Sequence, residues 1–449
     1  MIALAQATCA GVRADDGPNF DAVPADVGSE IISEDFFTDD DIGNEFMEDR
    51  PPSSGDGLGE VIDIEPIEPA ESLDGKSFSL DDLAWRKGEY RIVPYGIGWL
   101  NAAYDTERTV PGPFALYVQS REVEGKPGFN IDARATRLGM DLTGPSVGGA
   151  QYGGKIEIDF FGEATTENRP GVLLRHAYGE LRRDGWRLLG GQTWDVISPL
   201  VPDVLNYSVA WAAGNIGYRR AQIRVENESP IDDSTNLILQ ASLNDPVVTD
   251  FVTDSFIEGH DAGWPTVMGR LAVSFDPPRS GQGTQPATLG VSSLIGQLAA
   301  DYETPPVQLD RLYTTWALCA DMRVPLSHRA GVQGEFFWGN ELASYLGGIN
   351  QGIDRETRQA IRSIGGWVEL WYDLADNWHT HLGAGIDDPR NGDLSSGRRS
   401  QNVFYFANLV WDVTSLLNIG VEASWWDTQY VDLAPGEALR LETVVRYSF

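Results

Sequence analysis

Arginines recur at two-residue spacing in one short segment, where Arg220, Gln222 and Arg224 alternate with Ala221 and Ile223. Successive side chains of a β-strand point to opposite faces, so this spacing places the three polar residues on one face. A ring of guanidinium groups around a narrow passage favours anions, whereas a ring of carboxylates favours cations. The segment therefore predicts a selectivity site for small anions.

Three more residues are candidates for the same site. They are Arg134, which shares a face with Asp132 and Thr136, Arg175, which shares one with Ala177 and Gly179, and Gln192, a neutral donor. For any single arginine, a salt bridge across a wall or a contact with an aromatic girdle is the alternative role. The set lies on the second, fourth, fifth and sixth expected strands, and this clustering favours a ladder of side chains around a pore.

Other chemistry has weaker support in the sequence. His379 and His381 share a strand face but have no third ligand nearby, so no metal site is predicted. Asp245, Asp250 and Asp254 could hold calcium, but they lack EF-hand spacing and solvation is the simpler explanation. Neither a Gly-rich phosphate loop nor a nucleophile elbow is present. We therefore expect no catalytic residues, no cofactor and no enzyme activity.

The last thirteen residues, 437–449 (EALRLETVVRYSF), alternate in polarity and end on an aromatic residue. One face carries Leu439, Leu441, Thr443, Val445, Tyr447 and Phe449, and the other carries Arg440, Glu442, Val444, Arg446 and Ser448. A single strand of this kind also fits a soluble β-sandwich. In an outer-membrane barrel, the first face would contact lipid and the second a watery lumen, with Tyr447 and Phe449 forming the membrane-assembly signal.

Similar segments follow one another from Tyr90 to the C-terminus. We expect strands at 90–104, 129–142, 153–162, 172–183, 186–194, 216–225, 236–243, 267–275, 287–298, 311–324, 329–338, 358–372, 378–386, 402–411, 418–426 and 438–449. This even number is expected for a single-chain bacterial barrel. The fold class is therefore all-β, a transmembrane antiparallel up-and-down barrel of about sixteen strands.

The connections between these segments alternate in length. Short turns are expected at 182–185, 325–328, 374–377 and 414–417, and long segments at 105–128, 195–215, 244–265, 339–357 and 387–401. Two connections at 144–153 and 276–286 look long for the short side. Regular alternation is typical of outer-membrane barrels, which have short periplasmic turns and long external loops.

Composition agrees with a barrel and excludes helical membrane spans. The 449-residue chain has a mean hydropathy of -0.25 and no run of about eighteen apolar residues. Its net charge of -34 argues against nucleic-acid binding. Much of the excess acid precedes Trp85, where the basic residues are Arg13, Arg50 and Lys76. Cys9 and Cys319 are too few for a disulfide framework.

The region before the barrel divides into three parts. Residues 1–13 resemble the remnant of a signal peptide, and residues 14–76 form an acidic segment that we expect to be disordered in the periplasm. That segment is a solvated linker or a short motif for a periplasmic or cell-wall partner, formed by Phe36, Phe37, Ile42, Phe46 and Met47. A short helix is predicted at 77–88, because Ser79 and Asp82 form a capping box. The barrel domain is 89–449.

The segments VLLRHAYGEL (172–181) and WRLLGGQTWDVISPLVPDVLNYSVAWAAGNIGYRRAQIR (186–224) resemble the DcaP-like porin family of Gram-negative outer membranes. The resemblance covers about residues 88–449. It implies a sixteen-stranded trimeric porin that passes small, often anionic solutes such as dicarboxylates. The acidic segment departs from the family pattern, since it lacks the heptads of a coiled-coil extension.

The connection at 195–215 is the third external loop, and it is unusually apolar for a solvated segment. The resemblance implies that this loop folds inward and narrows the pore, with Trp194, Asp195, Asn206 and Tyr207 at the constriction. A lid over the mouth of the barrel is the alternative.

Together these features predict an outer-membrane porin for passive diffusion of small hydrophilic solutes, with a weak anion preference and a periplasmic N-terminus. Its expected partners are outer-membrane lipid, two further copies of the chain in a homotrimer, and small, possibly anionic solutes, but not nucleic acid. The alternatives are a barrel-type outer-membrane hydrolase resembling a phospholipase, which would need a Ser–His pair on an outward wall, and a soluble β-rich surface-binding protein.

Overall fold

The computed structural model describes residues 84–123, 125–162, 170–246, 255–258, 262–275, 286–302 and 305–449. The signal-peptide remnant and the acidic segment lie outside these residues, as does most of the helix expected at 77–88. Within the described part of that helix, Trp85–Lys87 forms a strand that pairs with the next one, Trp85 opposite Ile92. The helix prediction is therefore wrong for these residues, because an adjacent strand offers them backbone partners.

The strands are β1 (Trp85–Lys87), β2 (Tyr90–Asp105), β3 (Thr109–Pro111), β4 (Ala115–Val118), β5 (Gly128–Asp132), β6 (Arg137–Val147), β7 (Ala150–Asp159), β8 (Leu173–Arg183), β9 (Trp186–Trp194), β10 (Arg219–Asp232), β11 (Thr235–Asn244), β12 (Ser255–Glu258), β13 (Thr266–Phe275), β14 (Ala287–Tyr302), β15 (Gln308–Ser327), β16 (Ala330–Asn340), β17 (Ile353–Asp354), β18 (Gln359–Ala360), β19 (Arg362–Ala375), β20 (Trp378–Pro389), β21 (Arg399–Asp412), β22 (Leu417–Tyr430) and β23 (Gly436–Ser448). Two short 3₁₀ helices, η5 (Ala343–Tyr345) and η6 (Asn391–Asp393), lie in loops.

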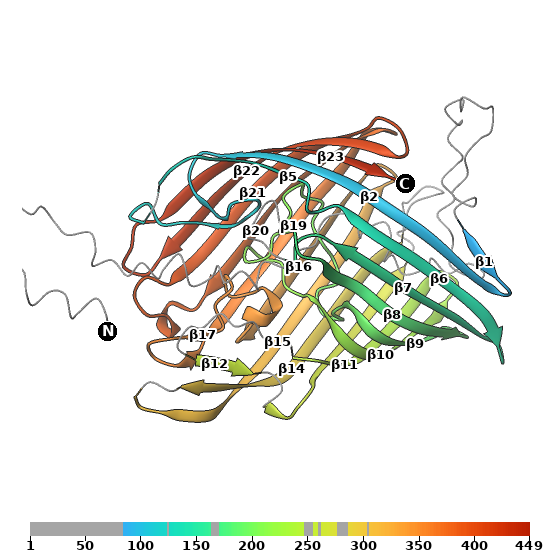
Figure 1. Ribbon diagram of the computed structural model, residues 1–449, viewed down its shortest axis with the longest axis horizontal. Helices are drawn as coiled ribbons and strands as arrows, with labels where there is room; N and C mark the ends of the chain where they lie inside the picture. Colours follow the sequence, from blue (N-terminus) through green and yellow to red (C-terminus); the bar gives the residue numbers. More distant parts are fainter. Residues whose placement is uncertain are drawn as a thin grey trace, which may run out of the picture.

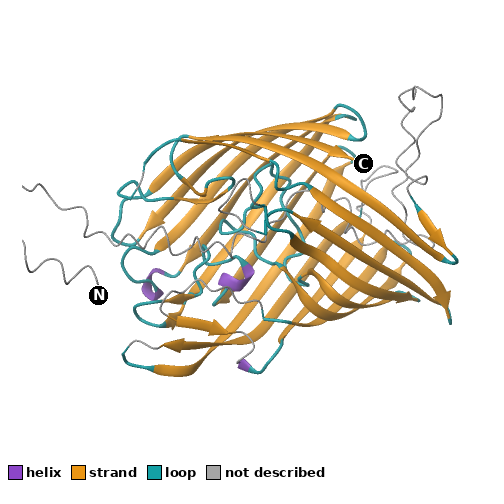
Figure 2. Ribbon diagram, in the orientation of Figure 1, coloured by secondary structure: helices purple, strands orange, loops and turns teal. Residues whose placement is uncertain are grey.

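One antiparallel sheet closes on itself to form the barrel (Figure 1). Strand β2 pairs with β23 on one side, from Ile97 opposite Ser448 to Asp105 opposite Arg440, and with β5 and β6 on the other. Strands β1 and β12 are short additions to the sheet, and β5 and β6 are two halves of one interrupted strand. The remaining strands make a closed sixteen-stranded barrel, which confirms the predicted fold class. The barrel is drawn almost entirely as strand and loop in Figure 2.

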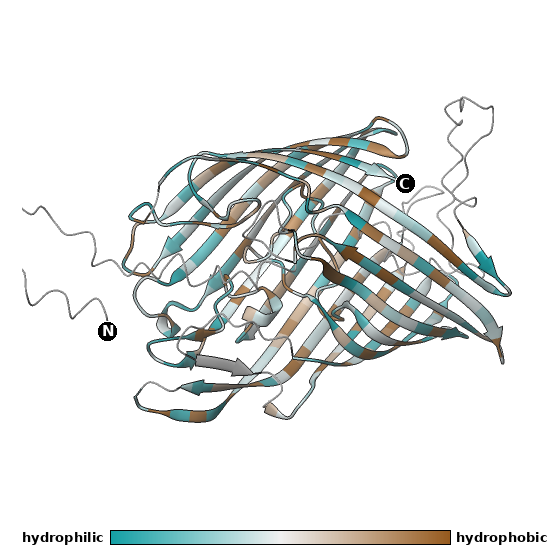
Figure 3. Cartoon of the chain, viewed as in Figure 1, coloured by the Kyte–Doolittle hydropathy of each residue, from teal (hydrophilic) through white to brown (hydrophobic). Residues whose placement is uncertain are grey.

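Polarity alternates along the strands (Figure 3), and burial follows the predicted faces. In β23 and the residue after it, Leu441, Tyr447 and Phe449 are exposed on the outside, whereas Arg440 and Val444 are buried inside. The faces predicted for β15, β21 and β22 are confirmed in the same way, with Leu318, Tyr405 and Trp425 outside and Asp321, Asn402 and Trp426 inside. An apolar outer wall around a charged interior is the arrangement that a bilayer requires of a barrel.

The turns at one end of the barrel are short. Strands β6 and β7 are joined by Gly148 and Gly149 alone, with φ values of 62° and 82° that only glycine adopts at little cost. The long connection suspected at 144–153 is therefore a tight hairpin. The connection suspected at 276–286 lies almost wholly outside the described residues. The C-terminal end of β23 lies at this short-turn end (Figure 1).

Two irregularities turn specific arginines inward. Between β5 and β6, five steps along the chain from Asp132 to Arg137 oppose four steps in β2, from Asn101 to Ile97. In β8, Arg175 is an extra residue between the pairs Leu174–Ile158 and His176–Glu157. Such β-bulges shift the alternation of side chains by one residue. As a result, Arg175 does not share its face with Ala177 and Gly179, contrary to the prediction.

Three long loops from the opposite end fold into the barrel. They are loop 1 (106–127, with β3 and β4), loop 3 (195–218) and loop 6 (341–361, with η5, β17 and β18). Their apolar residues form a buried cluster against the inner wall, which includes Phe114 and Tyr117 of loop 1, Tyr207 and Trp211 of loop 3, and Ile349 of loop 6. The inward course of loops 1 and 6 was not predicted from the sequence.

Candidate functional site

Loop 3 lies inside the barrel and is fixed to the wall by buried carboxylates. Three glutamates from β16, β19 and β22 each accept a hydrogen bond from a backbone N–H group of the loop. The pairs are Leu200 with Glu335 (2.7 Å), Asp203 with Glu369 (2.6 Å) and Leu205 with Glu422 (2.6 Å). All three acceptors are buried, and the distances lie at the short end of the range for N–H···O hydrogen bonds. The loop is therefore attached along its length, as expected for an inward constriction and not for a lid.

Loop 1 packs against the middle of loop 3. The Asn206 side chain accepts a hydrogen bond from the Ala115 N–H (3.1 Å) and donates one to its carbonyl (2.9 Å). Next to it, the Tyr207 ring lies 4.1 Å from that of Phe161 and 5.2 Å from that of Phe114. Asn206 and Tyr207 therefore join two loops, which places both predicted constriction residues in the packed interior.

The remaining predicted constriction residues lie where loop 3 leaves β9. The ring of Trp194 packs 6.1 Å from that of Trp211. Asp195 accepts a hydrogen bond from the Tyr218 N–H (2.9 Å) and forms a salt bridge with Arg220 (2.8 Å). Burial raises the pKa of Asp195 to about 6, although Arg220 opposes that shift. This ion pair joins the first residue of loop 3 to β10, which follows the loop.

Arg220 and Arg224 share the inner face of β10 with Gln222, as predicted. Arg220 also lies 4.1 Å above the Tyr345 ring and donates to the Ser344 carbonyl (2.9 Å), so it connects loop 3 to loop 6. Arg224 donates to Gln222 Oε1 and to Glu226, both at 2.9 Å. Both arginines are almost wholly buried. Both form salt bridges with carboxylates, Asp195 and Glu226, which is the alternative role considered for a single arginine.

The other two predicted arginines are ion-paired as well. Arg134 forms a salt bridge with Asp132 (2.5 Å), and Arg175 bonds to Glu157 and lies 3.3 Å from Asp159. All four members of the predicted arginine set therefore point inward and carry a bound counter-charge. The structure does not bring them together as one open ring of positive charge.

Gln192 points away from this set. It pairs in register with Ala221 on the outer face of β10, and its amide donates to the Leu174 carbonyl (2.5 Å). Leu188, on the same strand, is exposed and lies on the same outward face as Gln192. Alternation along β9 from Leu188 would have given this orientation, because side chains four residues apart on a strand lie on the same face.

Two arginines that the predicted set omitted lie together on the wall of β6 and β23. The guanidinium groups of Arg446 and Arg137 lie 4.1 and 5.7 Å from the centre of the Trp99 ring. Lys155 on the neighbouring β7 lies 5.2 Å above the Tyr95 ring. We call Arg137, Arg446 and Lys155 the basic patch. The β5–β6 bulge, which turns Arg137 inward, could not be located from the sequence alone.

Acidic side chains occupy another part of the wall, on β19 to β22. Asp373 and Asp412 both contact His379, at 2.7 and 3.0 Å, and all three side chains are about one-third exposed. Asp203 of loop 3 and His381 are also partly exposed. Because these residues face inward, their exposure indicates water inside the short-turn half of the barrel.

The same region contains a set of potential metal ligands that sequence reasoning missed. Asp203, Glu369 and His381 each offer one ligand atom, and these atoms lie within 4.8 Å of one another. The two partners of His381 thus come from loop 3 and β19, and His379 is not part of this set. No sequence pattern indicates Asp203 as a ligand, since its position depends on the inward course of loop 3.

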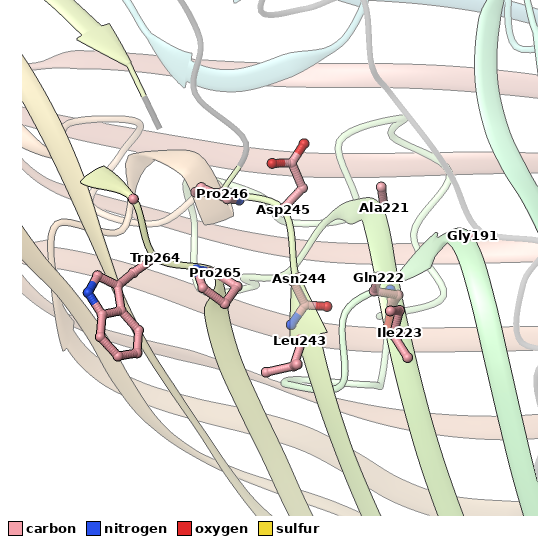
Figure 4. A pocket seen from close by; sticks show the side chains of 11 residues that line it. Gly191, Ala221, Gln222, Ile223, Leu243, Asn244, Asp245, Pro246, Trp264 and Pro265 are labelled. Atoms are coloured by element: carbon pink, nitrogen blue, oxygen red, sulfur yellow. The ribbon is translucent and has the colours of Figure 1, made fainter. Parts of the chain in front are cut away.

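A depression of about 520 Å³ lies at the outer wall, near the loop ends of β10 and β11 (Figure 4). Its lining includes the outward side chains of Ile223, Leu243 and Trp264, all strongly exposed. These residues belong to the apolar outer surface, so the depression is not part of the lumen.

Comparison with known proteins places this fold among outer-membrane barrels. The outer membrane channel DcaP of Acinetobacter baumannii has a TM-score of 0.65 and 20% identity, over 81% of this chain and 99% of that chain. OmpT of Vibrio cholerae has a TM-score of 0.51 and 12% identity, over 82% and 100%. OmpF of Salmonella typhi has a TM-score of 0.51 and 8% identity, over 82% and 100%.

No protein-family model matches the chain, and neither does any curated protein. Among the residues that the structure describes, no helix is long and apolar enough to cross a membrane. The similarity to DcaP agrees with the family that the sequence segments resemble. The chain therefore has the fold of the DcaP channel and of porin-like outer-membrane barrels.

Proposed function

We propose that this protein is an outer-membrane porin that lets small hydrophilic solutes diffuse passively through its barrel. The observation that carries the proposal is a closed sixteen-stranded barrel with an apolar outer wall, a charged interior and loop 3 attached across the inside. The bacterial outer membrane and a periplasmic N-terminus complete the proposal, because the short turns would then lie in the periplasm.

The proposed assembly is a homotrimer. One of the similar structures is a trimer form of in-vitro folded OmpT of Vibrio cholerae, with a TM-score of 0.50, 12% identity and coverage of 80% and 99%. A single barrel of this kind leaves many apolar side chains on its outside, which lipid or a second copy can cover equally well. Chemical cross-linking of protein extracted in mild detergent tests this part, with a ladder of three bands expected.

The proposed solute preference is a weak one for anions, including dicarboxylates. The basic patch supports it, since two guanidinium groups share one Trp99 ring on the inner wall. Carboxylates also face the basic patch, Glu157 beside Arg137 and Lys155, and Glu422 and Glu442 beside Arg446. The predicted set of Arg134, Arg175, Arg220 and Arg224 is held in direct salt bridges. The acidic side chains of β19 to β22 oppose the preference, which is why we expect it to be small.

Reversal potentials in a salt gradient test the preference. We expect a weak anion selectivity in the wild type and a shift towards cations in the double variant Arg137→Gln/Arg446→Gln. Arg183→Gln is the matched control, because its side chain lies in an exposed turn. A wild-type protein that clearly prefers cations would contradict the assignment of the basic patch, while leaving the channel itself intact.

A further inference from the structure

The inner wall carries a second charged group of residues that pore selectivity does not require. Asp203 of loop 3, Glu369 of β19 and His381 of β20 converge on one point. His381 Nδ1 lies 2.8 Å from Glu369 Oε1 and 3.6 Å from Asp203 Oδ2. Two carboxylate oxygens and one imidazole nitrogen from three separate segments form a ligand set that neither a linker nor a solvated acidic surface would produce.

We propose that Asp203, Glu369 and His381 bind a zinc ion that joins loop 3 to the barrel wall. A tetrahedral zinc ion holds nitrogen and oxygen ligands at about 2.0–2.2 Å, so that ligand atoms lie about 3.3–3.6 Å apart. The distances of 2.8 and 3.6 Å bracket this range. All three ligand atoms lie within 4.8 Å of one another, so small side-chain shifts would complete the geometry.

The ligands are held in place by their neighbours. Glu369 is fully buried; its Oε2 accepts the Asp203 N–H bond, and its Oε1 accepts a bond from Gln333 at 3.3 Å. Asn408 accepts from the His381 N–H (3.1 Å) and donates to the Asp203 carbonyl (2.6 Å). Hydrogen bonds that orient metal ligands raise metal affinity, and their loss typically costs about tenfold or more.

The donor set selects the kind of metal. Imidazole nitrogen suits zinc and other late first-row ions, whereas calcium and magnesium take oxygen ligands alone. The side chains of Asp203 and His381 are 26% and 15% exposed, so water in the lumen can supply the fourth ligand. On binding, zinc takes the position at His381 Nδ1, which must then be free of its proton.

His379 offers a matched control two residues away on the same inner face. Its Nδ1 lies 2.7 Å from Asp373 and its Nε2 lies 3.0 Å from Asp412. The two carboxylates are thus on opposite nitrogens, so a single ion cannot use both together with the ring. A His379→Ala variant removes a histidine of similar position and charge without touching the proposed site.

The test is a cobalt and zinc titration of the full chain, purified in detergent and stripped of metal with a chelator. We expect one cobalt ion per chain with the visible absorption of a tetrahedral complex, displaced by zinc. His381→Ala and Asp203→Asn should each weaken binding at least about tenfold, and His379→Ala should bind as the wild type does. Heat-modifiable migration on gels confirms that each variant is folded.

Three results would overturn the proposal: a wild type that binds neither metal, His381→Ala and Asp203→Asn variants that bind like the wild type, or a His379→Ala variant that loses binding. Each of these outcomes is independent of whether the barrel conducts ions. The zinc site can therefore fail while the porin function stands, and the reverse also holds.

Discussion

Buried arginines form two distinct populations on the inner wall of this barrel. Arg134, Arg175, Arg220 and Arg224 each form a direct salt bridge with a carboxylate. Arg137 and Arg446 lie together over one tryptophan ring, with Glu157 and Glu422 among the carboxylates that face them. A buried charge that loses its partner is strongly destabilising, because the remaining charge is left without solvent. The first population should therefore control stability and the second should control ion flow.

Arg175 tests this division. Arg175→Gln removes the salt bridges to the buried Glu157 and Asp159, although Arg137 and Lys155 still face Glu157. We therefore expect the free energy of unfolding to fall by about 3 kcal/mol. Urea unfolding followed by tryptophan fluorescence measures the change. The exposed pair of Arg183 with Asp184 is the control, and Arg183→Gln should change stability by about 1 kcal/mol or less. An Arg175→Gln variant with normal stability and altered ion selectivity would reverse the assignment.

Glu341, at the start of loop 6, makes stability depend on pH. Burial raises its pKa from 4.5 to about 8, and Thr315 donates a hydrogen bond to it. Between these two values the unfolded chain loses this proton and the folded chain keeps it, so stability falls as pH rises from 4.5 to about 8. The change should level off above that pH.

Glu341→Gln removes this titration and keeps an acceptor for Thr315. Its stability relative to the wild type should therefore rise across that pH range, as measured by urea unfolding at several pH values. A difference between the two proteins that does not vary with pH would mean that Glu341 is ionised in the folded state.

At the scale of single residues, the sequence predicted which face of a strand a side chain occupies better than it predicted which residue that side chain contacts. The period of two gave the faces of β15, β21, β22 and β23, because each of these strands alternates without interruption. It did not give the partners of the arginines, since Glu157 and Asp195 reach them across strands or from a loop. The β-bulge at Arg175 was also not predicted, because one extra residue cannot be recognised in the polarity pattern of a short strand.

Loop 3 is the element on which pore size should depend. Glu335 and Glu422 hold its backbone, and a typical hydrogen bond contributes about 0.5–1.5 kcal/mol. The double variant Glu335→Leu/Glu422→Leu should therefore loosen the loop, raise the mean single-channel conductance and increase current noise. Glu437→Leu at the rim, where the side chain pairs with Arg121, is the control. Unchanged conductance in the double variant would show that loop 3 does not limit the pore.

The order of elements was largely predictable, but the interior was not. Strand β9 coincides with the expected 186–194, and the turn before it reverses at Asp184 and Gly185, both with positive φ. Loops 1 and 6 were expected to be external, yet they fill the barrel beside loop 3. Their apolar runs, such as Phe114–Val118, could have indicated this course. An apolar loop segment avoids water by packing against the inner wall, in loops 1 and 6 as in loop 3.

Closure of the whole barrel depends on the contact between its first and last strands. The backbones of Gly96 and Phe449 exchange two hydrogen bonds of 2.9 Å, and a Cβ atom at Gly96 would lie 2.3 Å from the Phe449 ring. We expect Gly96→Val to impair closure, seen as a smaller heat-modifiable fraction on gels. At Gly98 on the same face, the nearest atom to a new Cβ is 3.7 Å away, so Gly98→Val is the control. Equal folding of both variants would argue against this seam as the critical one.

The porin function itself is tested most directly by single-channel recording in planar lipid bilayers. Purified, heat-modifiable protein should insert and produce discrete conductance steps that occur in groups of three, one for each barrel of a trimer. Its reversal potential in a salt gradient should show a weak anion preference. Folded protein that inserts into bilayers but carries no current under any applied voltage would contradict the account, because the charged interior would then enclose no continuous path for water.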